Sequence, residues 1–416
     1  MTLDADILTH VPAPSARPVS LRVTPAAERA IQQGHPWVFD QAITDQNHDE
    51  GHPGDLAVIY RSDRRFLALG LFDPDSNIRV RILHRGKPVT IDQAWFDAAL
   101  LQSVRRRDSI EPTGTTGYRI VHGENDQLPG LIVDRYDATF VLKIYTAAWI
   151  PHLDRMLHAL GNACRVERIV LRLSRGLQEQ TGNLHGLSDG IILRGDPLHG
   201  PVLFKENGLT FEADPIRGHK TGFFLDQRDN RARIEPLSAG KDVLNVFAYS
   251  GGFSLYAARG GARSVVSLDI SQPALDAAVR HFALNKAHPN IAAAEHERLC
   301  ADAFDAMKEM ARDRRRFDLV IIDPPAFATK QAHVDRAIAA YEQLTGLGLD
   351  LLEPGGKIVM ASCSSRVDDA AFFQAVQRAA RRSGRPLRDL EQTGHAVDHP
   401  IGFKEGAYLK CLFATA

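Results

Sequence analysis

The stretch Asn245–Ala262, NVFAYSGGFSLYAARGGA, decides the fold of the C-terminal half of the chain. An apolar run that ends in this stretch predicts a strand, and the residues after Gly251-Gly252 predict a helix that closes at the glycines 260 and 261. A strand, a tight turn of small residues and a helix start bring backbone N–H groups close to a ligand. The stretch therefore predicts a strand-turn-helix unit with a ligand at its turn.

The chain from about Asp242 onward alternates short apolar strands with helices. The sequences of the predicted strands are VLNVF, VVSL, FDLVII, KIVMA and YLKCLF. Such alternation is typical of an α/β, Rossmann-like domain in which helices cover both faces of a mostly parallel sheet. Ligands of these sheets bind at the carboxyl ends of the strands, so we expect the chemistry just after each strand.

Acidic residues follow three of the predicted strands. Asp269 is placed to bind a ribose diol, because both carboxylate oxygens can accept hydroxyl hydrogen bonds. Asp302, in LCADAF (299–304), follows a further strand that is expected between VVSL and FDLVII. A carboxylate there could accept a hydrogen bond from the amino group of an adenine. Asp323 opens the run DPPAF, in which two prolines fix the backbone and hold the preceding carboxylate at a set angle. These positions predict a nucleoside-like ligand.

The residues of the turn discriminate between two cofactors that bind to such a strand-turn-helix unit. A dinucleotide needs glycines spaced G-x-G-x-x-G, and Phe247 and Tyr249 at the equivalent positions would crowd its diphosphate. S-adenosylmethionine carries no phosphate and tolerates that bulk, while a turn without a ligand remains the alternative. Gln227 and Arg228 are predicted to close over the cofactor, although a helix cap and a surface ion pair explain them equally. The predicted cofactor-binding residues are Gln227, Arg228, Asn245, Phe247, Tyr249, Ser250, Asp269, Ile270, Asp302 and Asp323.

Upstream of this domain, composition and periodicity divide the chain into further blocks. Residues 1–18 read as a flexible tail, and residues 19–92 as a small, mostly antiparallel β domain. Residues 93–200 predict an α+β domain, and residues 201–416 form the α/β domain. The Asn207-Gly208 pair is a hairpin signal at the start of this last domain.

Composition excludes several classes of protein. Apolar residues at 44% and charged residues at 24% are ordinary for a globular chain, and no apolar run is long enough to span a membrane. Four cysteines without a C-x-x-C pair predict a reducing cytoplasm, with neither a disulfide framework nor a metal site. A net charge of −1 excludes a nucleic-acid coat protein. The local basic runs at 103–109, 311–318 and 378–388 are interpreted as solvated helix faces.

Five motifs together resemble a known family. In chain order they are KTGFFLDQRDNR (220–231), NVFAYSGGFSLYAARGGA, LDIS, DPPAF and SCSS. The chain is similar to the RlmI-type class I S-adenosylmethionine-dependent 23S ribosomal RNA (cytosine-5)-methyltransferases. The resemblance implies a seven-stranded methyltransferase sheet, an N-terminal PUA-type RNA-binding domain, a middle domain of the strand-strand-helix-strand-strand type, and large-subunit ribosomal RNA as partner.

Cys363 is the candidate nucleophile. Carbon-5 of a pyrimidine is a poor nucleophile until a thiolate adds to carbon-6, whereas exocyclic nitrogens need no such thiol. Cys363 follows the strand KIVMA, on the predicted catalytic edge, and related enzymes carry their nucleophile in an S-C motif there; buried core packing is the alternative. Many RNA cytosine-5 methyltransferases have a second cysteine directly after the prolines, where this chain has Ala326.

The substrate base would meet two further residues. Asp323 is a candidate partner for the ring nitrogen or amino edge of a cytosine, and Phe327 for stacking on the extruded base, with packing of the loop as the alternative for Phe327. Rival functions are methylation of a guanine or adenine nitrogen, methylation of uracil carbon-5, and a non-catalytic RNA-binding assembly factor. The target nucleotide, the form of the RNA, the proton-removing base and the oligomeric state, a homodimer included, stay open.

Overall fold

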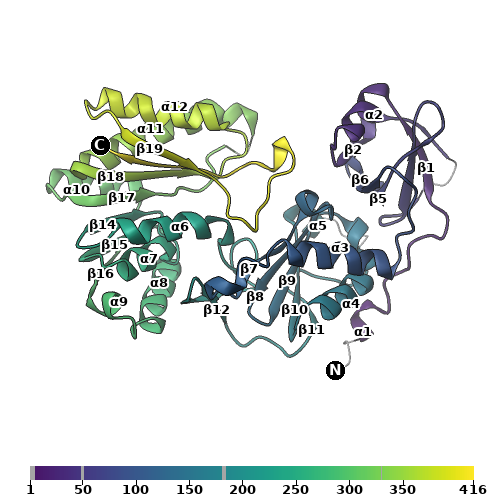
Figure 1. Cartoon of the computed structure of the whole chain (residues 1–416), viewed down its shortest axis with the longest axis horizontal. Coiled ribbons are helices and arrows are strands. Elements are labelled where there is room, and N and C mark those ends of the chain that lie inside the picture. The colour runs from purple at the N-terminus through teal and green to yellow at the C-terminus, as the bar shows by residue number, and fades with distance from the viewer. Residues whose placement is uncertain (1–4, 48–50, 180–183, 329) are drawn as a thin grey trace. The chain divides into compact units, whose positions relative to one another are not determined.

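The computed structural model describes residues 5–47, 51–179, 184–328 and 330–416 (Figure 1). The chain forms two compact units. Unit 1 comprises residues 1–208, 213–225 and 398–404, and unit 2 comprises residues 209–212, 226–397 and 405–416. Within the described ranges, no helix is both long and apolar enough to cross a membrane.

The N-terminal part of unit 1 is a six-stranded sheet with the order β2-β6-β5-β4-β1-β3. All of its pairs are antiparallel except β1 with β4. Its apolar side chains alternate along β4 and enclose a small core that includes Ile59 and Val80, which confirms the predicted β domain. The elements are β1 (Val19–Val23), α2 (Pro25–Gln32), β2 (Trp37–Phe39), η1 (Asp40–Ala42), β3 (Ile43–Gln46), β4 (Leu56–Tyr60), β5 (Phe66–Phe72) and β6 (Ile78–Arg85).

Residues 5–18 differ from the flexible tail that composition predicted. Ala5–Leu8 form a short helix, α1. Ile7, Leu8 and Val11 pack against the core of unit 1, and the backbone N–H of Ser15 donates to the buried Asp55. Burial of three apolar side chains and one charge-assisted hydrogen bond orders this segment.

The middle part of unit 1 is a five-stranded sheet with the order β11-β10-β9-β8-β7. Helices α3 and α4 pack against it through a core that contains the fully buried Phe96 and Trp149. Residues 117–136 form two antiparallel strands, because the backbone reverses after η3. The elements are α3 (Gln93–Arg105), η2 (Glu111–Thr113), β7 (Gly117–His122), η3 (Gly123–Asp126), β8 (Leu131–Tyr136), β9 (Thr139–Ile144), η4 (Ala147–His152), α4 (Leu153–Ala163), β10 (Arg168–Leu173), α5 (Arg175–Gln178) and β11 (Ile192–Arg194).

Arg107 corrects the interpretation of the first basic run as a solvated helix face. Its side chain is 1% exposed, and its guanidinium binds both oxygens of Asp126 at 2.8 and 2.6 Å. The remaining N–H groups donate to the carbonyls of Ser103, Arg119 and Asp398. A buried guanidinium is stable when all five donors are satisfied, so this arginine organises the middle domain and is unavailable to a nucleic acid.

The chain passes from unit 1 to unit 2 through a hairpin. Its strands are β12 (Val202–Glu206) and β13 (Leu209–Ala213). Asn207 and Gly208 adopt φ values of 48° and 82°, which are the left-handed conformations that a two-residue hairpin turn requires. The predicted hairpin at Asn207-Gly208 is therefore confirmed.

Unit 2 contains a seven-stranded sheet with the order β16-β15-β14-β17-β18-β20-β19. The first five strands are parallel, and β20 and β19 run antiparallel to their neighbours. This confirms the predicted doubly wound α/β domain. The elements are η5 (Leu225–Gln227), α6 (Arg228–Ile234), η6 (Glu235–Leu237), β14 (Asp242–Val246), α7 (Gly252–Arg259), β15 (Ser264–Asp269), α8 (Gln272–Leu284), α9 (Pro289–Ala293), β16 (Glu295–Cys300), α10 (Ala303–Arg312), β17 (Phe317–Ile322), η7 (Gln331–His333), α11 (Val334–Asp350), β18 (Leu352–Ser362), α12 (Asp369–Arg382), β19 (Arg388–Thr393), η8 (Lys404–Gly406) and β20 (Lys410–Thr415).

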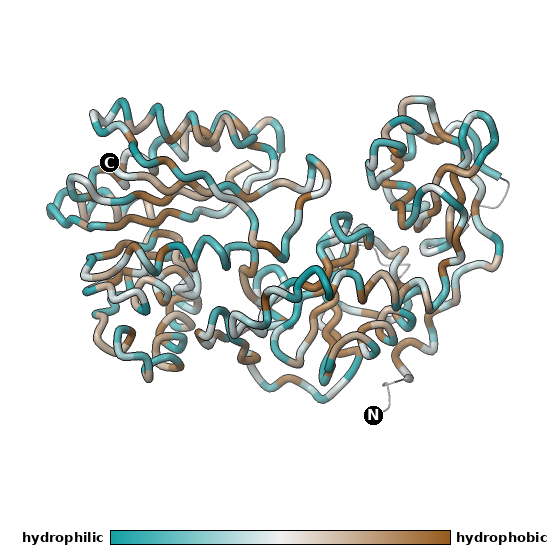
Figure 2. The backbone as a smooth tube through the Cα atoms, viewed as in Figure 1, coloured by the Kyte–Doolittle hydropathy of each residue, from teal (hydrophilic) through white to brown (hydrophobic). Residues whose placement is uncertain are grey.

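Helices cover both faces of this sheet. Leu244 and Val246 of β14 belong to the core formed with α10, α11 and α12. Asn245, between them, points to the other face, where it bonds Ser254 of α7. In Figure 2 the central strands are brown along most of their length, as expected for strands that are buried on both faces.

Acid should destabilise the fold through two buried histidines. His152 and His281 are 0% exposed, and burial lowers the pKa of each from 6.5 to about 4. The unfolded chain takes up these protons near pH 6.5 and the folded chain does not, so stability is lost as the pH falls from 6.5 toward 4. Each histidine should lower the free energy of unfolding by roughly 2 kcal/mol as the pH falls from 6.5 to 5.

Thermal unfolding at pH 7, 6 and 5 measures this effect. The midpoint should fall with pH, and His152→Gln should make the pH dependence shallower. A midpoint that does not change between pH 7 and pH 5 would contradict the prediction.

Candidate functional site

The site lies where the order of the sheet reverses. β14 pairs with both β15 and β17, and the chain builds the sheet outward from β14 in one direction before it returns to add β17 on the other side. Ligands of doubly wound sheets bind at the carboxyl ends of the strands beside this point. The turn at 247–251, Asp323 and Cys363 directly follow β14, β17 and β18, which are adjacent strands. At about 4.8 Å per strand, Cys363 is about 10 Å across the edge from the turn.

The turn after β14 has an unusual backbone. Phe247, Tyr249 and Gly251 have φ values of 61°, 48° and 73°, so two bulky residues adopt the left-handed conformation that favours glycine. Such conformations cost about 1–3 kcal/mol each and concentrate at ligand sites, where surrounding contacts enforce them. The sequence predicted a flexible glycine turn. The structure instead has a turn whose shape is fixed at residues that are not glycine.

Asp269 enforces the shape of this turn. One carboxylate oxygen accepts the backbone N–H of Tyr249 at 2.7 Å, and the other accepts that of Ser271 at 2.8 Å. Asp269 is half-buried at the end of β15, so each oxygen keeps a lone pair for a further donor. The carboxylate can therefore hold the turn and bind a diol at the same time.

His281, on α8, is a residue of the site that sequence reasoning missed. Its Nδ1 donates to the carbonyl of Ser250 at 2.8 Å, and its Nε2 accepts the backbone N–H of Glu212 at 3.0 Å. Acceptance at Nε2 requires the neutral ring with its proton on Nδ1, and burial favours the neutral form. A single histidine at a helical core position carries no signal for this role, because the contacts come from residues 31 and 69 positions away.

Gln227 and Arg228 are both 3% exposed. Arg228 nevertheless forms an ion pair, because its Nε lies 3.1 Å from Oδ1 of Asp229, whose side chain is 45% exposed, so the ion-pair alternative stays open for this residue. Gln227 occupies the position before α6, but its side chain makes no capping bond, which excludes the helix-cap alternative. Instead, its Oε1 accepts from Asn230 at 2.6 Å.

Three predicted cofactor-binding residues have buried polar atoms that lack a protein partner. Across the described residues, these atoms include Nε2 of Gln227, Oγ of Ser250 and Oδ1 of Asn245. Such atoms are costly to bury unless a ligand or water satisfies them. Asn245 is fully buried, and its amide begins a hydrogen-bonded chain through Ser254 and Ser267. The unsatisfied atoms at 227 and 250 fit a polar cofactor seated over the turn.

Ile270 and Asp302 lie at the carboxyl ends of β15 and β16. Ile270 is 74% exposed, which is unusual for a large aliphatic side chain and suits one face of an adenine ring. Asp302 is exposed and caps α10, where its Oδ1 accepts from the backbone N–H groups of Phe304 and Asp305. Their contacts with an adenine stay predictions.

The DPPAF turn connects the cofactor turn to Cys363. The backbone N–H of Asp323 lies 3.3 Å from the carbonyl oxygen of Val246, the residue before the turn at Phe247. The Sγ atom of Cys363 lies 3.8 Å from the carbonyl oxygen of Pro324. Cys363 is a half-buried residue that directly follows β18 at the edge of the sheet. The structure therefore brings together the turn, Asp323 and Cys363 as one row.

Phe327 packs against the protein. Its ring centroid lies 5.3 Å from that of Tyr341 on α11, and the side chain is half-buried at the margin of the core. The structure therefore supports packing of the loop by this ring. A contact with an extruded base stays a prediction.

The other cysteines have different environments. Cys411 in β20 is fully buried, and burial raises its pKa, so this thiol belongs to the core. Cys164 is half-buried after α4, and burial raises its pKa as well. Cys300 is exposed at the end of β16, with its Sγ 3.5 Å from the carbonyl oxygen of Ile270.

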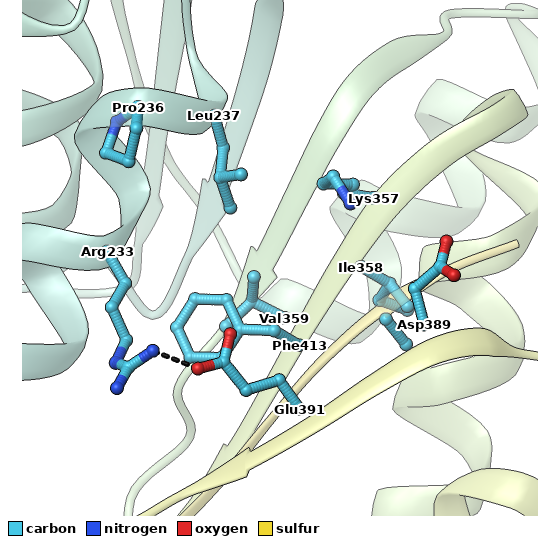
Figure 3. A pocket seen from close by; sticks show the side chains of 10 residues that line it. Arg233, Pro236, Leu237, Lys357, Ile358, Val359, Asp389, Glu391 and Phe413 are labelled. Atoms are coloured by element: carbon cyan, nitrogen blue, oxygen red, sulfur yellow. Dashed lines mark hydrogen bonds and ion pairs between the residues drawn. The ribbon is translucent and has the colours of Figure 1, made fainter.

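A cavity of about 200 Å³ lies elsewhere in unit 2 (Figure 3). Apolar and charged side chains line it, and an ion pair between Arg233 and Glu391 lies at one side. Its β18 residues, Lys357 to Val359, form the first half of the ladder with β20 and precede Cys363 by four to six residues. The cavity is therefore not placed for chemistry at the carboxyl edge.

Fold and site define the class of protein. A strand-turn-helix unit without phosphate-binding glycines, a carboxylate at the end of the second strand and unsatisfied polar atoms at Asn245 and Ser250 indicate an S-adenosylmethionine-dependent methyltransferase. A family model of that description matches residues 183–393, and a PUA-like domain model matches residues 21–85.

The chain belongs to the RlmI-like ribosomal RNA large subunit methyltransferases. It is 48% identical to the ribosomal RNA large subunit methyltransferase of Deinococcus radiodurans over 97% of this chain and 98% of that one. It is 36% identical to ribosomal RNA large subunit methyltransferase I of Aliivibrio fischeri over 94% and 98%. The crystal structure of SMU.776 complexed with SAH has the same fold, with a TM-score of 0.80, 23% identity and coverage of 95% and 100%.

Gly251→Ala should weaken binding of S-adenosylmethionine about 10-fold, because strain of about 1–2 kcal/mol would fall on the turn. Gly251 has a φ of 73°, and an added Cβ would lie 2.7 Å from Cβ of Ala278. Titration calorimetry measures the affinity. Gly240→Ala is the matched control, since Gly240 has a φ of 69° and open space around it. Equal affinities in the two variants would contradict the prediction.

Proposed function

We propose that this protein methylates carbon-5 of a cytosine in 23S ribosomal RNA through a covalent adduct with Cys363. The observation that carries the proposal is the position of this thiol. Cys363 lies at the carboxyl edge of the sheet and is half-buried, with its Sγ 3.8 Å from the carbonyl oxygen of Pro324 in the turn that Asp323 begins. A thiol in a core position, such as Cys411, could not reach a base.

The role of Cys363 follows from the electronic structure of cytosine. The thiolate adds to carbon-6, which forms the S–C6 bond and moves the π electrons toward carbon-5. S-adenosylmethionine supplies an electrophilic methyl group on a sulfonium. After carbon-5 has taken the methyl group, a base removes the carbon-5 proton. The electrons of the C–H bond re-form the ring double bond, and the thiolate leaves.

The remaining site residues hold the reactants. Asp269 fixes the turn and is placed to bind the ribose hydroxyls, and the turn at Phe247–Gly251 seats the cofactor over the sheet. Asp323 is held between the turn and Cys363, where it can bind the polar edge of the cytosine. Binding to the ring nitrogen requires a proton on one of the two partners.

Large-subunit ribosomal RNA is the proposed substrate, as the names of the relatives indicate for those proteins. A base within a duplex is out of reach, so the enzyme would take a single-stranded base or extrude one. The PUA-like domain supports this assignment, because such a domain can find the target loop by shape and phosphate contacts.

Mapping of modified bases in ribosomal RNA tests the proposal. RNA from cells with the protein should contain one 5-methylcytosine that is missing from cells without it. Purified protein should also form a denaturant-stable adduct with RNA that carries 5-fluorocytosine at this site, because fluorine blocks removal of the carbon-5 substituent. A methyl group on a purine nitrogen, or no difference between the two RNAs, would refute it.

A further inference from the structure

Lys410 is a buried lysine beside the candidate nucleophile. It begins β20 and is 2% exposed. In the antiparallel ladder it lies opposite Ser362, the residue before Cys363. Its Nζ donates to the carbonyl of Ser364 at 2.7 Å and to that of Tyr408 at 3.0 Å. The ammonium group is thus bonded to the residue that follows Cys363.

Burial of an ammonium group is costly unless opposite charge compensates for it. Desolvation lowers the pKa of Lys410, and the charges of Asp369, Cys363 and Asp368 act in the opposite direction. The two carboxylates lie at the start of α12, outside the core. Cys363 is therefore one of the three groups whose negative charge stabilises the cation.

Other groups around the thiol oppose its ionisation. The carboxyl group of Asp323, at the end of β17, acts on the same Tyr341 hydroxyl as Cys363 does, so these two groups share one environment. Asp368 and Asp369, at the start of α12, bring negative charge that acts on Lys410. Tyr341 contributes a neutral hydroxyl that bonds Ser362 and Ser364. A thiolate formed here without a nearby cation would be destabilised by these carboxylates.

We propose that the ammonium group of Lys410 stabilises the thiolate of Cys363 and so prepares it for attack on the pyrimidine. Cys363 releases its proton to solvent before the substrate binds, and Lys410 keeps its own proton throughout. Lys410 acts through Cys363 and is a positioning residue. Its part in methyl transfer rests on the proposed function, whereas its effect on the thiol can be measured without substrate.

The pH dependence of alkylation measures this effect in the full-length protein. In a Cys164→Ser, Cys300→Ser background, iodoacetamide reports on Cys363, because Cys411 is fully buried. Lys410→Met should raise the midpoint of the rate profile by about one pH unit or more and lower the rate at pH 7 about 10-fold. The rate at high pH, where the thiol is fully ionised, should stay the same.

Lys357→Met is the matched control. Lys357 lies at the other end of the same ladder, opposite Thr415, to whose hydroxyl it donates at 3.1 Å. Its removal should leave the midpoint unchanged. Lys410→Arg keeps the positive charge, so its alkylation midpoint should lie within about half a pH unit of the midpoint of the parent protein. This variant provides a test if Lys410→Met does not fold.

Two results would overturn the proposal. An unchanged midpoint in Lys410→Met would exclude the charge effect, and equal loss of rate at every pH would show that Lys410 only holds the backbone. Failure of the proposed function looks different. If Cys363→Ala still transfers methyl groups while the alkylation midpoint responds to Lys410, the thiolate is stabilised but is not the nucleophile.

Discussion

Replacement of Cys363 by alanine should reduce methyl transfer to RNA at least 1,000-fold, roughly the loss that follows removal of a covalent nucleophile. Without the thiol, carbon-5 of the cytosine keeps its low nucleophilicity, and the exposed Cys300 at the same edge ends β16, four strands away from β18. Binding of S-adenosylmethionine should not change, because Cys363 lies about 10 Å across the edge from the turn. Single-turnover transfer of a labelled methyl group measures the chemical step.

Cys164→Ala is the control for this variant. Cys164 is a half-buried cysteine that follows α4 in unit 1, so its replacement tests the general cost of losing a thiol. It should retain full methyl transfer. If Cys363→Ala kept activity within 10-fold of the parent, the covalent mechanism would be excluded, and methylation of a nitrogen would become the better assignment.

Replacement of Asp269 by alanine should weaken binding of S-adenosylmethionine at least 100-fold. The carboxylate accepts two backbone N–H bonds and would also bind the ribose. Bonds to a charged acceptor contribute about 1.5–3 kcal/mol each, so the loss of two exceeds the 2.7 kcal/mol that corresponds to 100-fold. The strained conformations of Phe247 and Tyr249 would also relax once their anchor is removed.

Calorimetric titration of the variant with S-adenosylmethionine gives this affinity. Asp276→Ala is the matched control, because Asp276 lies on the adjacent α8, its side chain is 48% exposed, and its carboxylate accepts from the exposed Gln272 and from Arg298. The affinity of Asp269→Asn should lie between those of Asp269→Ala and Asp276→Ala, because an amide keeps one acceptor oxygen. An affinity within 3-fold of the parent in Asp269→Ala would mean that the turn holds its shape without this carboxylate.

The basic runs show how composition alone misleads. The run at 103–109 supplies the buried Arg107, and arginines of the run at 378–388 pair with Glu342. Arginines cluster in sequence for reasons that a local window does not reveal, because their partners come from other elements. Assignment of an RNA-binding surface therefore requires the ion pairs and not the charge count.

The amino-acid sequence by itself determined the class of fold and the row of strand-end residues. Alternating apolar strands and helices favour a parallel sheet that helices cover, and parallel strands place their carboxyl ends on one edge, so Asp269, Asp323 and Cys363 were predictable from their positions after strands. The fold class and the strand-end residues were predictable because they depend on the local spacing of apolar residues, which can be read directly from the sequence.

Only the tertiary structure decided which groups act on these residues. His281 supports the turn from α8, and Lys410 reaches the residue after Cys363 from the last strand, 46 positions along the chain. Neither residue type nor spacing predicts such contacts, because they arise when separate elements pack. Burial then sets their chemistry: it keeps His281 neutral and requires compensating charge for Lys410, and burial is a property of the folded chain.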